Sequence, residues 1–256
     1  MLAAVRRFYR IVALLIACPA VMAAAAVSEL FAFGYWRRVE LGAFWARHWS
    51  RIAAFIVGVR IKVSGDIPSG SGHLVVSNHL GYLDILAHGA VFSLRFAPKA
   101  EIRRWPFFGW LTALGTPVWI DRKNPRMSAL YAEAFRQTME HGINMLVYPE
   151  GTSTDGEHGL LPFKSTPFAA VLTSRMSILP TLLFYRNRNG GKSEAAWHDD
   201  TPFAVHLWRF LGSAGVDIEM YILPEIGVSG EEARKELAAR VHDMMEKEYW
   251  KIEKIS

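Results

Sequence analysis

Short apolar runs of strand type alternate with helical segments from Val59 onward, and this alternation restricts the fold more than any other feature. Each run is bounded by glycine, proline or polar residues, as strands usually are. The expected strands are residues 61–63, 74–77, 94–97, 117–121, 143–148, 178–185 and 216–223. Because helices separate most of them, the pattern predicts one α/β domain over residues 58–256, with a mixed or mostly parallel sheet flanked by helices.

The helices of this domain are indicated by apolar stripes and by their end signals. They are expected at residues 84–91, 128–140 and 167–175 and at the C-terminus. Gly142 marks the end of the second of these helices. Ser229 and Glu232 have the spacing of a capping box and predict the start of the last helix. Residues 195–210 fit no single class.

The N-terminus carries a long apolar segment. Residues 1–10 contain three arginines, whereas residues 11–33 contain only one charge, Glu29, and one proline, Pro19. Such a segment is long enough to cross a bilayer of roughly 30 Å or to re-enter it as a broken helix. The alternative is a cleaved signal peptide, because the alanine-rich residues 20–26 resemble a cleavage region.

An aromatic and basic pattern follows the apolar segment and argues against cleavage. Tryptophans alternate with arginines through residues 36–38 and 44–49, and residues 52–57 continue the apolar face. Helices that lie in a membrane interface mix tryptophan and arginine in this way. We therefore expect residues 1–57 to form a membrane-attachment module of two helices, with an ordinary N-terminal helical lobe as the alternative.

Charge and composition narrow the partners. The net charge of +5 and the pI of about 9.4 suit either nucleic acid or an anionic membrane. Nine tryptophans and fifteen phenylalanines favour the membrane, so no nucleic-acid partner is expected. Cys18 is the single cysteine, which excludes an internal disulfide and any cysteine-based zinc site.

The chemistry centres on His79 and Asp84. At this spacing the two side chains would point about 140° apart on one helix, so they meet only if His79 lies in a loop before the helix that begins near Asp84. An acid that accepts the Nδ1 proton leaves Nε2 free to take a proton from a hydroxyl. The alternative is a loop histidine beside a helix-capping aspartate.

Two other segments point to ligand binding. Glu150, Gly151 and Thr152 follow a buried strand, which is where open α/β sheets place their ligands. Aromatic residues between Trp105 and Trp110 are crowded beside Lys99 and two arginines. Core packing explains the aromatic residues alone, whereas an acyl-chain or membrane contact explains the aromatic residues and the cations together.

Several blocks occur in a fixed order. They are Asn78-His79-x4-Asp84, Gly115-Thr-Pro-Val-Trp-Ile120-Asp121-Arg122, Pro149-Glu150-Gly151-Thr152 and Ile178-Leu179-Pro180, together with Lys99 and Pro106-Phe-Phe-Gly109. Their order and spacing resemble those of the glycerolipid acyltransferases, the 1-acyl-sn-glycerol-3-phosphate acyltransferase family. The resemblance covers roughly residues 58–190.

This resemblance implies a membrane-bound enzyme of phospholipid biosynthesis or remodelling, with its catalytic domain facing the cytoplasm. It would move a fatty acyl group from acyl-CoA or acyl carrier protein to a lysolipid hydroxyl, without a further cofactor. His79 would be the general base and Asp84 its orienting partner. The remaining implied substrate-binding residues are Lys99, Arg122, Glu150, Gly151, Thr152 and Lys164, with Pro180 near the acyl path.

The chain departs from the family where an arginine usually follows Glu-Gly-Thr, because here the position is Ser153. A serine cannot supply a bidentate cation for a phosphate monoester. The acceptor is therefore either a lysophosphatidic acid bound without that arginine, a lysolipid with a larger head group, or a lipid without phosphate such as lyso-ornithine lipid.

Two other functions compete with acyl transfer. A metal-dependent hydrolase would use His73, His79, Asp84 and His88 as ligands, although their spacing matches no common zinc pattern. A catalytically silent protein that binds lysolipid on membranes would have no need of a base beside an acid.

Overall fold

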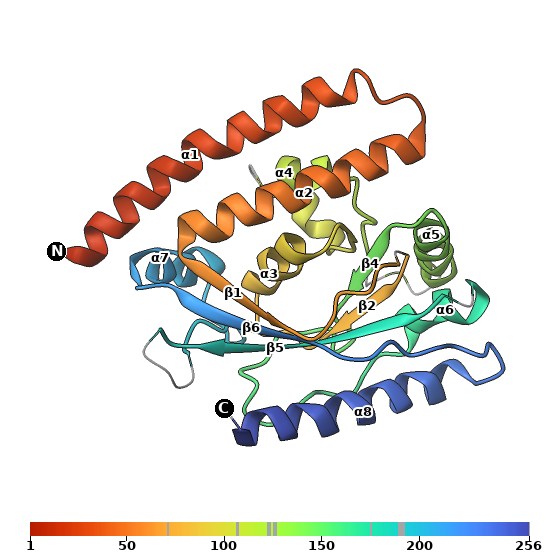
Figure 1. Ribbon diagram of the computed structural model, residues 1–256. Coiled ribbons are helices and arrows are strands. Elements are labelled where there is room, and N and C mark those ends of the chain that lie inside the picture. The colour runs from red at the N-terminus through yellow and green to blue at the C-terminus, as the bar shows by residue number, and fades with distance from the viewer. Residues whose placement is uncertain are drawn as a thin grey trace.

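The fold is built on a mixed six-stranded sheet with the order β1-β6-β5-β2-β4-β3 (Figure 1). The computed structural model describes residues 1–70, 72–105, 108–121, 124, 127–174, 176–188 and 193–255. The strands are β1 Val59–Ser64, β2 Leu74–Ser77, β3 Leu94–Phe96, β4 Asn144–Val147, β5 Ile178–Arg186 and β6 Val216–Ile222.

Strand direction places several loop ends at one edge of the sheet. β5, β2, β4 and β3 run parallel to one another, β6 runs antiparallel to β5, and β1 is parallel to β6. The predicted α/β class with a mixed sheet is confirmed. The segments that leave β2 and β4 therefore emerge side by side at the carboxyl edge of the sheet.

Helices cover both faces of the sheet (Figure 1). The helices are α1 Leu2–Glu29, α2 Tyr35–Val57, α3 Leu83–Val91, α4 Phe108–Leu114, α5 Ser128–Glu140, α6 Ala169–Ser174, α7 Phe203–Gly212 and α8 Arg234–Ile255, with short 3-10 turns η1 Ala100–Arg104 and η3 Thr166–Phe168. One core lies between the sheet and α2, α3 and α7; the other lies between the sheet and α5, α6 and α8.

The strand β5 separates these two cores by simple alternation. Leu182 and Phe184 pack with the α8 core, whereas Leu183 and Tyr185 pack with the α3 core. Successive side chains on a strand point to opposite faces, so Thr181 lies on the same face as Leu183 and Tyr185. This face packs against α3, the helix that follows His79. Side chains of β5 therefore lie close to the segment that carries His79.

The N-terminal helices form an antiparallel pair that lies over the α3 side of the sheet (Figure 1). α1 begins at Leu2, nine residues before the predicted apolar segment, and it is the one helix in the described part of the chain that is long and apolar enough to cross a membrane. Its exposed apolar residues include Phe8, Leu15 and Ile16. The division of the chain at residue 57 stays a prediction. α2 ends at Val57, and this residue belongs to the core between the sheet and α2, α3 and α7.

A buried cation fixes α1 to the α/β domain at the end of α7. Arg10 is only 2% exposed, and its guanidinium donates hydrogen bonds to the carbonyls of Phe210, Leu211 and Ser213 at the end of α7. The last carbonyls of a helix have no partner within the helix, so a cation there satisfies them and complements the helix dipole. α1 is thus attached by a polar contact as well as by packing.

Two predicted elements were wrong in detail. Residues 117–121 form no strand; Val118 and Ile120 donate to the carbonyls of Phe96 and Pro98, and only an isolated bridge joins Ile120 to Lys99. Pro98 lacks an N–H donor on the side that faces residues 118–120, so a continuous ladder cannot form.

The last helix begins at Arg234, later than the proposed capping box. Glu236 accepts the N–H of Ala233, the residue that precedes the helix. The capping glutamate is therefore Glu236, one turn after the predicted Glu232. The ambiguous residues 195–210 consist of an irregular segment followed by α7. The predicted end of α5 before Gly142 is confirmed, and Gly142 has φ +73°.

Candidate active site

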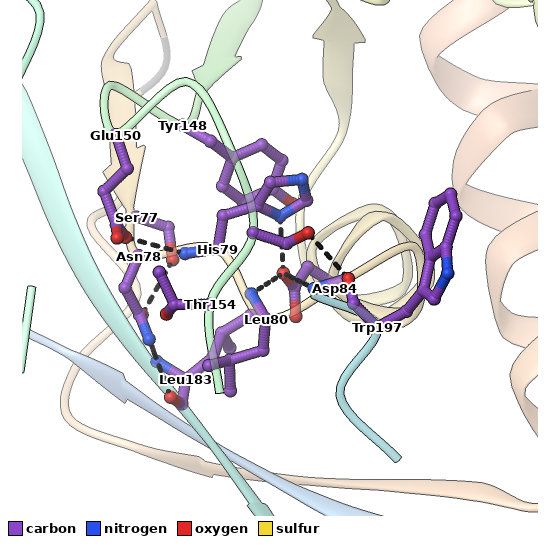
Figure 2. A network of polar contacts seen from close by, with 12 residues as sticks. Ser77, Asn78, His79, Leu80, Asp84, Tyr148, Glu150, Thr154, Leu183 and Trp197 are labelled. Carbon is purple, nitrogen blue, oxygen red and sulfur yellow. Dashed lines mark hydrogen bonds and ion pairs between the residues drawn. The ribbon is translucent and has the colours of Figure 1, made fainter. Parts of the chain in front are cut away.

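The site begins where β2 ends, and a side chain continues the sheet there. Ser77 pairs with Thr181 as the last register pair between β2 and β5. The next residue, Asn78, donates from Nδ2 to the Leu183 carbonyl at 3.0 Å and accepts the Leu183 N–H at 2.8 Å (Figure 2). The Asn78 amide thus replaces a backbone pair and frees its own backbone to turn into the His79 loop.

His79 and Asp84 meet as the sequence predicts. Asp84 lies in the first turn of α3, and its Oδ2 is 2.7 Å from His79 Nδ1. A buried carboxylate at this atom accepts the Nδ1 proton, so Nε2 carries the free lone pair. The His79 side chain is 22% exposed, and no described residue bonds to Nε2. The arrangement presents a proton acceptor to solvent from a fixed ring.

Asp84 is held by donors on several sides. Its side chain is fully buried, and its Oδ2 also accepts the N–H groups of Leu80 at 2.6 Å and Gly81 at 3.0 Å. The Tyr185 hydroxyl donates to Oδ1 at 2.6 Å. A buried carboxylate needs such donors to stay charged. The acid therefore has a fixed orientation toward the imidazole.

A second histidine lies beneath this pair and is kept neutral. His88 is on α3, one turn after Asp84, and burial lowers its pKa to about 4. Its Nδ1 is 3.0 Å from the Asp84 carbonyl and 3.2 Å from the Tyr148 hydroxyl, and its Nε2 is 2.9 Å from Thr181 Oγ1. The Tyr148 ring stacks on His79, with centroids 4.1 Å apart. Neither Tyr148 nor Tyr185 was predicted from the sequence to belong to the site.

Glu150 connects the loop after β4 to the His79 loop (Figure 2). Its Oε1 accepts the His79 N–H at 2.9 Å, and its Oε2 accepts the Leu161 N–H at 3.1 Å. The residue is 4% exposed, and burial raises the pKa of this carboxyl to about 7 although both N–H groups oppose that rise. Glu150, predicted to bind the acceptor, is directed at backbone amides of the site.

The other predicted binding residues lie around the same edge of the sheet. Gly151 has φ +77°, and a Cβ there would lie 2.2 Å from Lys164 Nζ, so the lysine passes directly over it. Thr152 and Lys164 are exposed. Lys99 is also exposed and follows β3, next to β4 in the sheet. This places two flexible cations near the carboxyl edge.

Three predicted contributions are placed elsewhere or not placed. Arg122 lies outside the described residues, as do Pro106 and Phe107 of the aromatic block. Pro180 is buried inside β5 and pairs in register with Val76. It is therefore part of the sheet interior.

Ser153, which stands in place of the expected arginine, has a partner that the sequence did not reveal. Its hydroxyl donates to the Trp197 carbonyl at 2.6 Å, and the Trp197 N–H donates to the Leu80 carbonyl at 2.8 Å. Gly81 allows this approach, because a Cβ there would lie 2.9 Å from the Trp197 nitrogen. Residues 193–202, the Trp197 segment, therefore rest on the loop that carries His79.

An open apolar pocket adjoins this segment. It has a volume of about 400 Å³ and is lined by Trp105, Phe108, Phe203, Ala204, Leu207, Trp208 and Leu211. The Tyr82 ring, from the His79 loop, packs edge-on against Phe203 and Trp197. Two of the aromatic residues predicted to contact acyl chains or membrane, Trp105 and Phe108, thus line an apolar surface that reaches the site.

The ligands required for a metal-dependent hydrolase are dispersed. His73 precedes β2, at the opposite edge of the sheet from His79, and its Nδ1 is 2.7 Å from Ser177 Oγ. His88 is bonded to Thr181. In the described ranges, no group of three or more histidine, cysteine, aspartate or glutamate residues is arranged to hold a metal ion.

The fold and the site define an α/β enzyme with an acid-oriented histidine at the carboxyl edge of its sheet, and comparisons with known proteins give the family. Residues 59–183 match the Acyltransferase family. A lyso-ornithine lipid O-acyltransferase of Rhodobacter capsulatus is 38% identical over 195 residues, which are 74% of this chain and 70% of the relative. The chain belongs to the acyltransferase family.

Other relatives agree with this assignment, and one solved structure has the same fold. A lyso-ornithine lipid O-acyltransferase of Pseudomonas aeruginosa is 31% identical, over 75% of this chain and 73% of its own. A 1-acyl-sn-glycerol-3-phosphate acyltransferase of Neisseria gonorrhoeae is 29% identical, over 66% of each chain. The crystal structure of the 1-acyl-sn-glycerophosphate acyltransferase PlsC of Thermotoga maritima has the same fold, with a TM-score of 0.69, 17% identity and coverage of 99% of this chain and 98% of its own.

Proposed function

We propose that this acyltransferase moves a fatty acyl group from an acyl thioester to the free hydroxyl of a lysolipid. The observation that carries the proposal is the His79–Asp84 pair, in which Nδ1 lies 2.7 Å from Asp84 Oδ2 and the His79 side chain is 22% exposed. An alcohol is too weak an acid to attack a thioester at neutral pH, so a positioned base contributes about 10²–10⁴-fold. A silent lipid-binding protein would not need this base.

In this mechanism His79 Nε2 takes the proton of the acceptor hydroxyl as its oxygen attacks the thioester carbonyl. The tetrahedral intermediate then collapses, the C–S bond breaks, and the imidazolium returns the proton to the departing thiolate. Asp84 stays ionised throughout and stabilises the imidazolium. The products are an ester and a free thiol, without an acyl-enzyme intermediate.

We infer that the acceptor carries an amino-acid head group, as lyso-ornithine lipid does. The relatives named for that lipid are 38% and 31% identical to this chain. Ser153 supports the same acceptor, because its hydroxyl holds the Trp197 segment where an arginine for a phosphate would project. An ornithine head group presents one carboxylate and one ammonium, and the exposed Lys99 and Lys164 are sufficient for a single carboxylate.

A 1-acyl-glycerol-3-phosphate is the second candidate acceptor. The Neisseria gonorrhoeae relative named for it is 29% identical, and Lys99 and Lys164 would then bind the phosphate without help from residue 153. A phosphate monoester carries up to two negative charges, so this binding would be weaker than in a site with an arginine.

The enzyme would work at a membrane, with its catalytic domain on the cytoplasmic side, where acyl thioesters are made. The exposed apolar face of α1 supports membrane attachment. Acyl-CoA or acyl carrier protein would serve as the co-substrate, and the mechanism requires no other cofactor.

A panel of acceptors tests the function. The full chain in detergent micelles would receive labelled acyl-CoA or acyl carrier protein and, in separate reactions, lyso-ornithine lipid, lysophosphatidic acid or lysophosphatidylethanolamine. We expect label in ornithine lipid, with a kcat/KM for lyso-ornithine lipid at least about 10-fold above that for lysophosphatidic acid. One hydrogen bond to a charged group changes an equilibrium or rate constant by about this factor. Preference for lysophosphatidic acid would reverse the acceptor assignment. Absence of transfer to every acceptor with either donor would refute acyl transfer to lysolipids.

A further inference from the structure

Two tyrosines, the buried Tyr185 and the partly buried Tyr148, contact the His79–Asp84 pair from different sides, and acid–base catalysis as described above does not use them. The Tyr148 ring lies nearly parallel to the His79 ring, with an interplanar angle of 14° and centroids 4.1 Å apart. Its hydroxyl is 3.2 Å from His88 Nδ1. The ring is therefore fixed at its far end by a second histidine while its face supports the first.

Tyr185 contacts the acid instead of the base. Its hydroxyl donates to Asp84 Oδ1 at 2.6 Å, the carboxylate oxygen that is not bonded to His79. The residue lies on β5, on the face that packs against α3, and its side chain is buried. Because β5 also bonds to Asn78, this donor comes from the same rigid strand that fixes the start of the His79 loop.

Neither phenol acts as a proton carrier. Burial raises the pKa of both Tyr148 and Tyr185 well above the usual value for tyrosine, and the charge of Asp84 acts in the same direction. Both hydroxyls therefore stay protonated at any pH at which the enzyme is used. Their effect on His79 must come from packing, from the ring quadrupole and from hydrogen bonding to Asp84.

We propose that Tyr148 and Tyr185 are positioning residues that set the basicity of His79 in opposite directions. This inference rests on the proposed function for its kinetic test alone. The face of an aromatic ring is electron-rich, so the Tyr148 ring stabilises the imidazolium and raises the basicity of His79. The Tyr185 hydroxyl donates a hydrogen bond to Asp84 and so partly neutralises the negative charge of the carboxylate. This weakens the electrostatic attraction between the carboxylate and the imidazolium, which lowers the basicity of His79.

Other charged or titratable groups also face this pair and are part of the test. They are His88 on α3, Glu150 after β4, Tyr82 in the His79 loop and, through Tyr82, His206 on α7. His88 has a pKa of about 4 and stays neutral over the range used. Glu150 has a pKa of about 7 and titrates within that range, so each measurement is repeated in an E150Q background.

The experiment measures the pKa of His79 in four variants of the full chain in detergent micelles. The readout is the NMR titration of the His79 Cε1–H signal, assigned as the signal lost in His79→Ala. The acid limb of the pH profile of kcat/KM gives a second value, because the base must be neutral to act. The NMR value reports on the inference even if the enzyme uses a different acceptor from the one proposed.

We expect Tyr148→Leu to lower the pKa of His79 by about 0.5–1 pH unit and Tyr185→Phe to raise it by about 0.5 pH unit. Tyr148→Phe keeps the ring and should leave the pKa within about 0.2 pH unit of the wild-type value. Tyr221→Phe, on the opposite face of the sheet, is the matched control and should change nothing. Circular dichroism confirms that each variant is folded.

Opposite shifts cannot arise from general loosening of the site, which would move both variants toward the pKa of a solvated histidine. Shifts of the same sign in Tyr148→Leu and Tyr185→Phe, or no shift in either, would overturn the proposal. A Tyr148→Phe shift as large as that of Tyr148→Leu would also overturn it, because the hydroxyl and not the ring would then be responsible. Should Tyr148→Leu fail to fold, Tyr148→Met serves as the variant without a ring, with the same expected sign.

Discussion

The Ser153 hydroxyl donates a hydrogen bond to the Trp197 carbonyl across 2.6 Å, and this contact joins two loops that are far apart in the sequence. The same tryptophan also donates its N–H to the Leu80 carbonyl, beside His79. A larger residue at position 153 would have to displace the Trp197 segment or turn away from it. The side chain at this position therefore helps to hold the Trp197 segment against the loop that carries His79.

Replacing Ser153 by arginine should change acceptor choice. We expect Ser153→Arg to raise kcat/KM for lysophosphatidic acid relative to lyso-ornithine lipid by roughly 10- to 100-fold, since a hydrogen bond to a charged group contributes about 1.5–3 kcal/mol. Competition assays with both lipids in one micelle measure this ratio directly. Thr173→Arg, which adds the same charge on α6, is the control. An unchanged ratio in Ser153→Arg would show that residue 153 does not select the acceptor.

Removing the base should abolish transfer without unfolding the protein. His79→Ala should lower kcat by about 10²–10⁴-fold, and Asp84→Asn should also be severe because an amide favours the wrong imidazole tautomer. His141→Ala is a suitable control, because this exposed histidine follows α5 at the opposite edge of the sheet. Initial rates with a saturating donor measure the effect. Activity of His79→Ala within a few-fold of wild type would eliminate the mechanism.

Glu150 should make stability depend on pH. Its folded-state pKa of about 7 lies above the ordinary value of 4.5, so the folded state binds a proton more tightly than the unfolded state. This contribution is complete below about pH 4.5 and is lost as pH rises through 7, with a total of about 3 kcal/mol. Denaturant titrations from pH 4 to 8 should therefore show a steeper decline for wild type than for Glu150→Gln. Parallel curves for the two proteins would contradict this expectation.

The exposed face of α1 should control membrane binding. Replacing Phe8, Leu15 and Ile16 together by glutamine removes exposed apolar area without entering either core. Each such side chain contributes about 1.5–3 kcal/mol when it is buried in an apolar phase, so we expect vesicle binding to weaken by at least roughly 100-fold. Co-sedimentation with anionic vesicles measures it, and Leu130→Gln on α5 is the control. Undiminished binding would place the attachment surface elsewhere.

The sequence was sufficient for the parts of the site that are local. His79 and Asp84 are close along the chain, and the change from a strand to a helix between them allows the two side chains to meet. The α/β class followed from the alternation of strands and helices in the same way. The strand predicted at residues 117–121 was wrong because strand propensity does not take account of the missing N–H group of Pro98 on the neighbouring segment.

The missed parts of the site depend on pairing over long distances in the sequence. Tyr185 reaches Asp84 only because β5 lies beside β2, and Tyr148 reaches His79 only because β4 lies on the other side. No local pattern indicates which strands become neighbours. The Trp197 segment was ambiguous for a similar reason, since its backbone hydrogen bonds go to Leu80 and Ser153 and not to a regular element of its own.

The Asn78 amide gives the site a mechanical property. Since its side chain continues the hydrogen-bond ladder to Leu183, the loop that carries His79 belongs to the same cooperative unfolding unit as the central strands. Deuterium should therefore enter the Leu183 amide only as slowly as it enters the middle of the sheet. On heating, catalytic activity and β-structure should disappear together, so the enzyme passes from active to unfolded without an intact but inactive form.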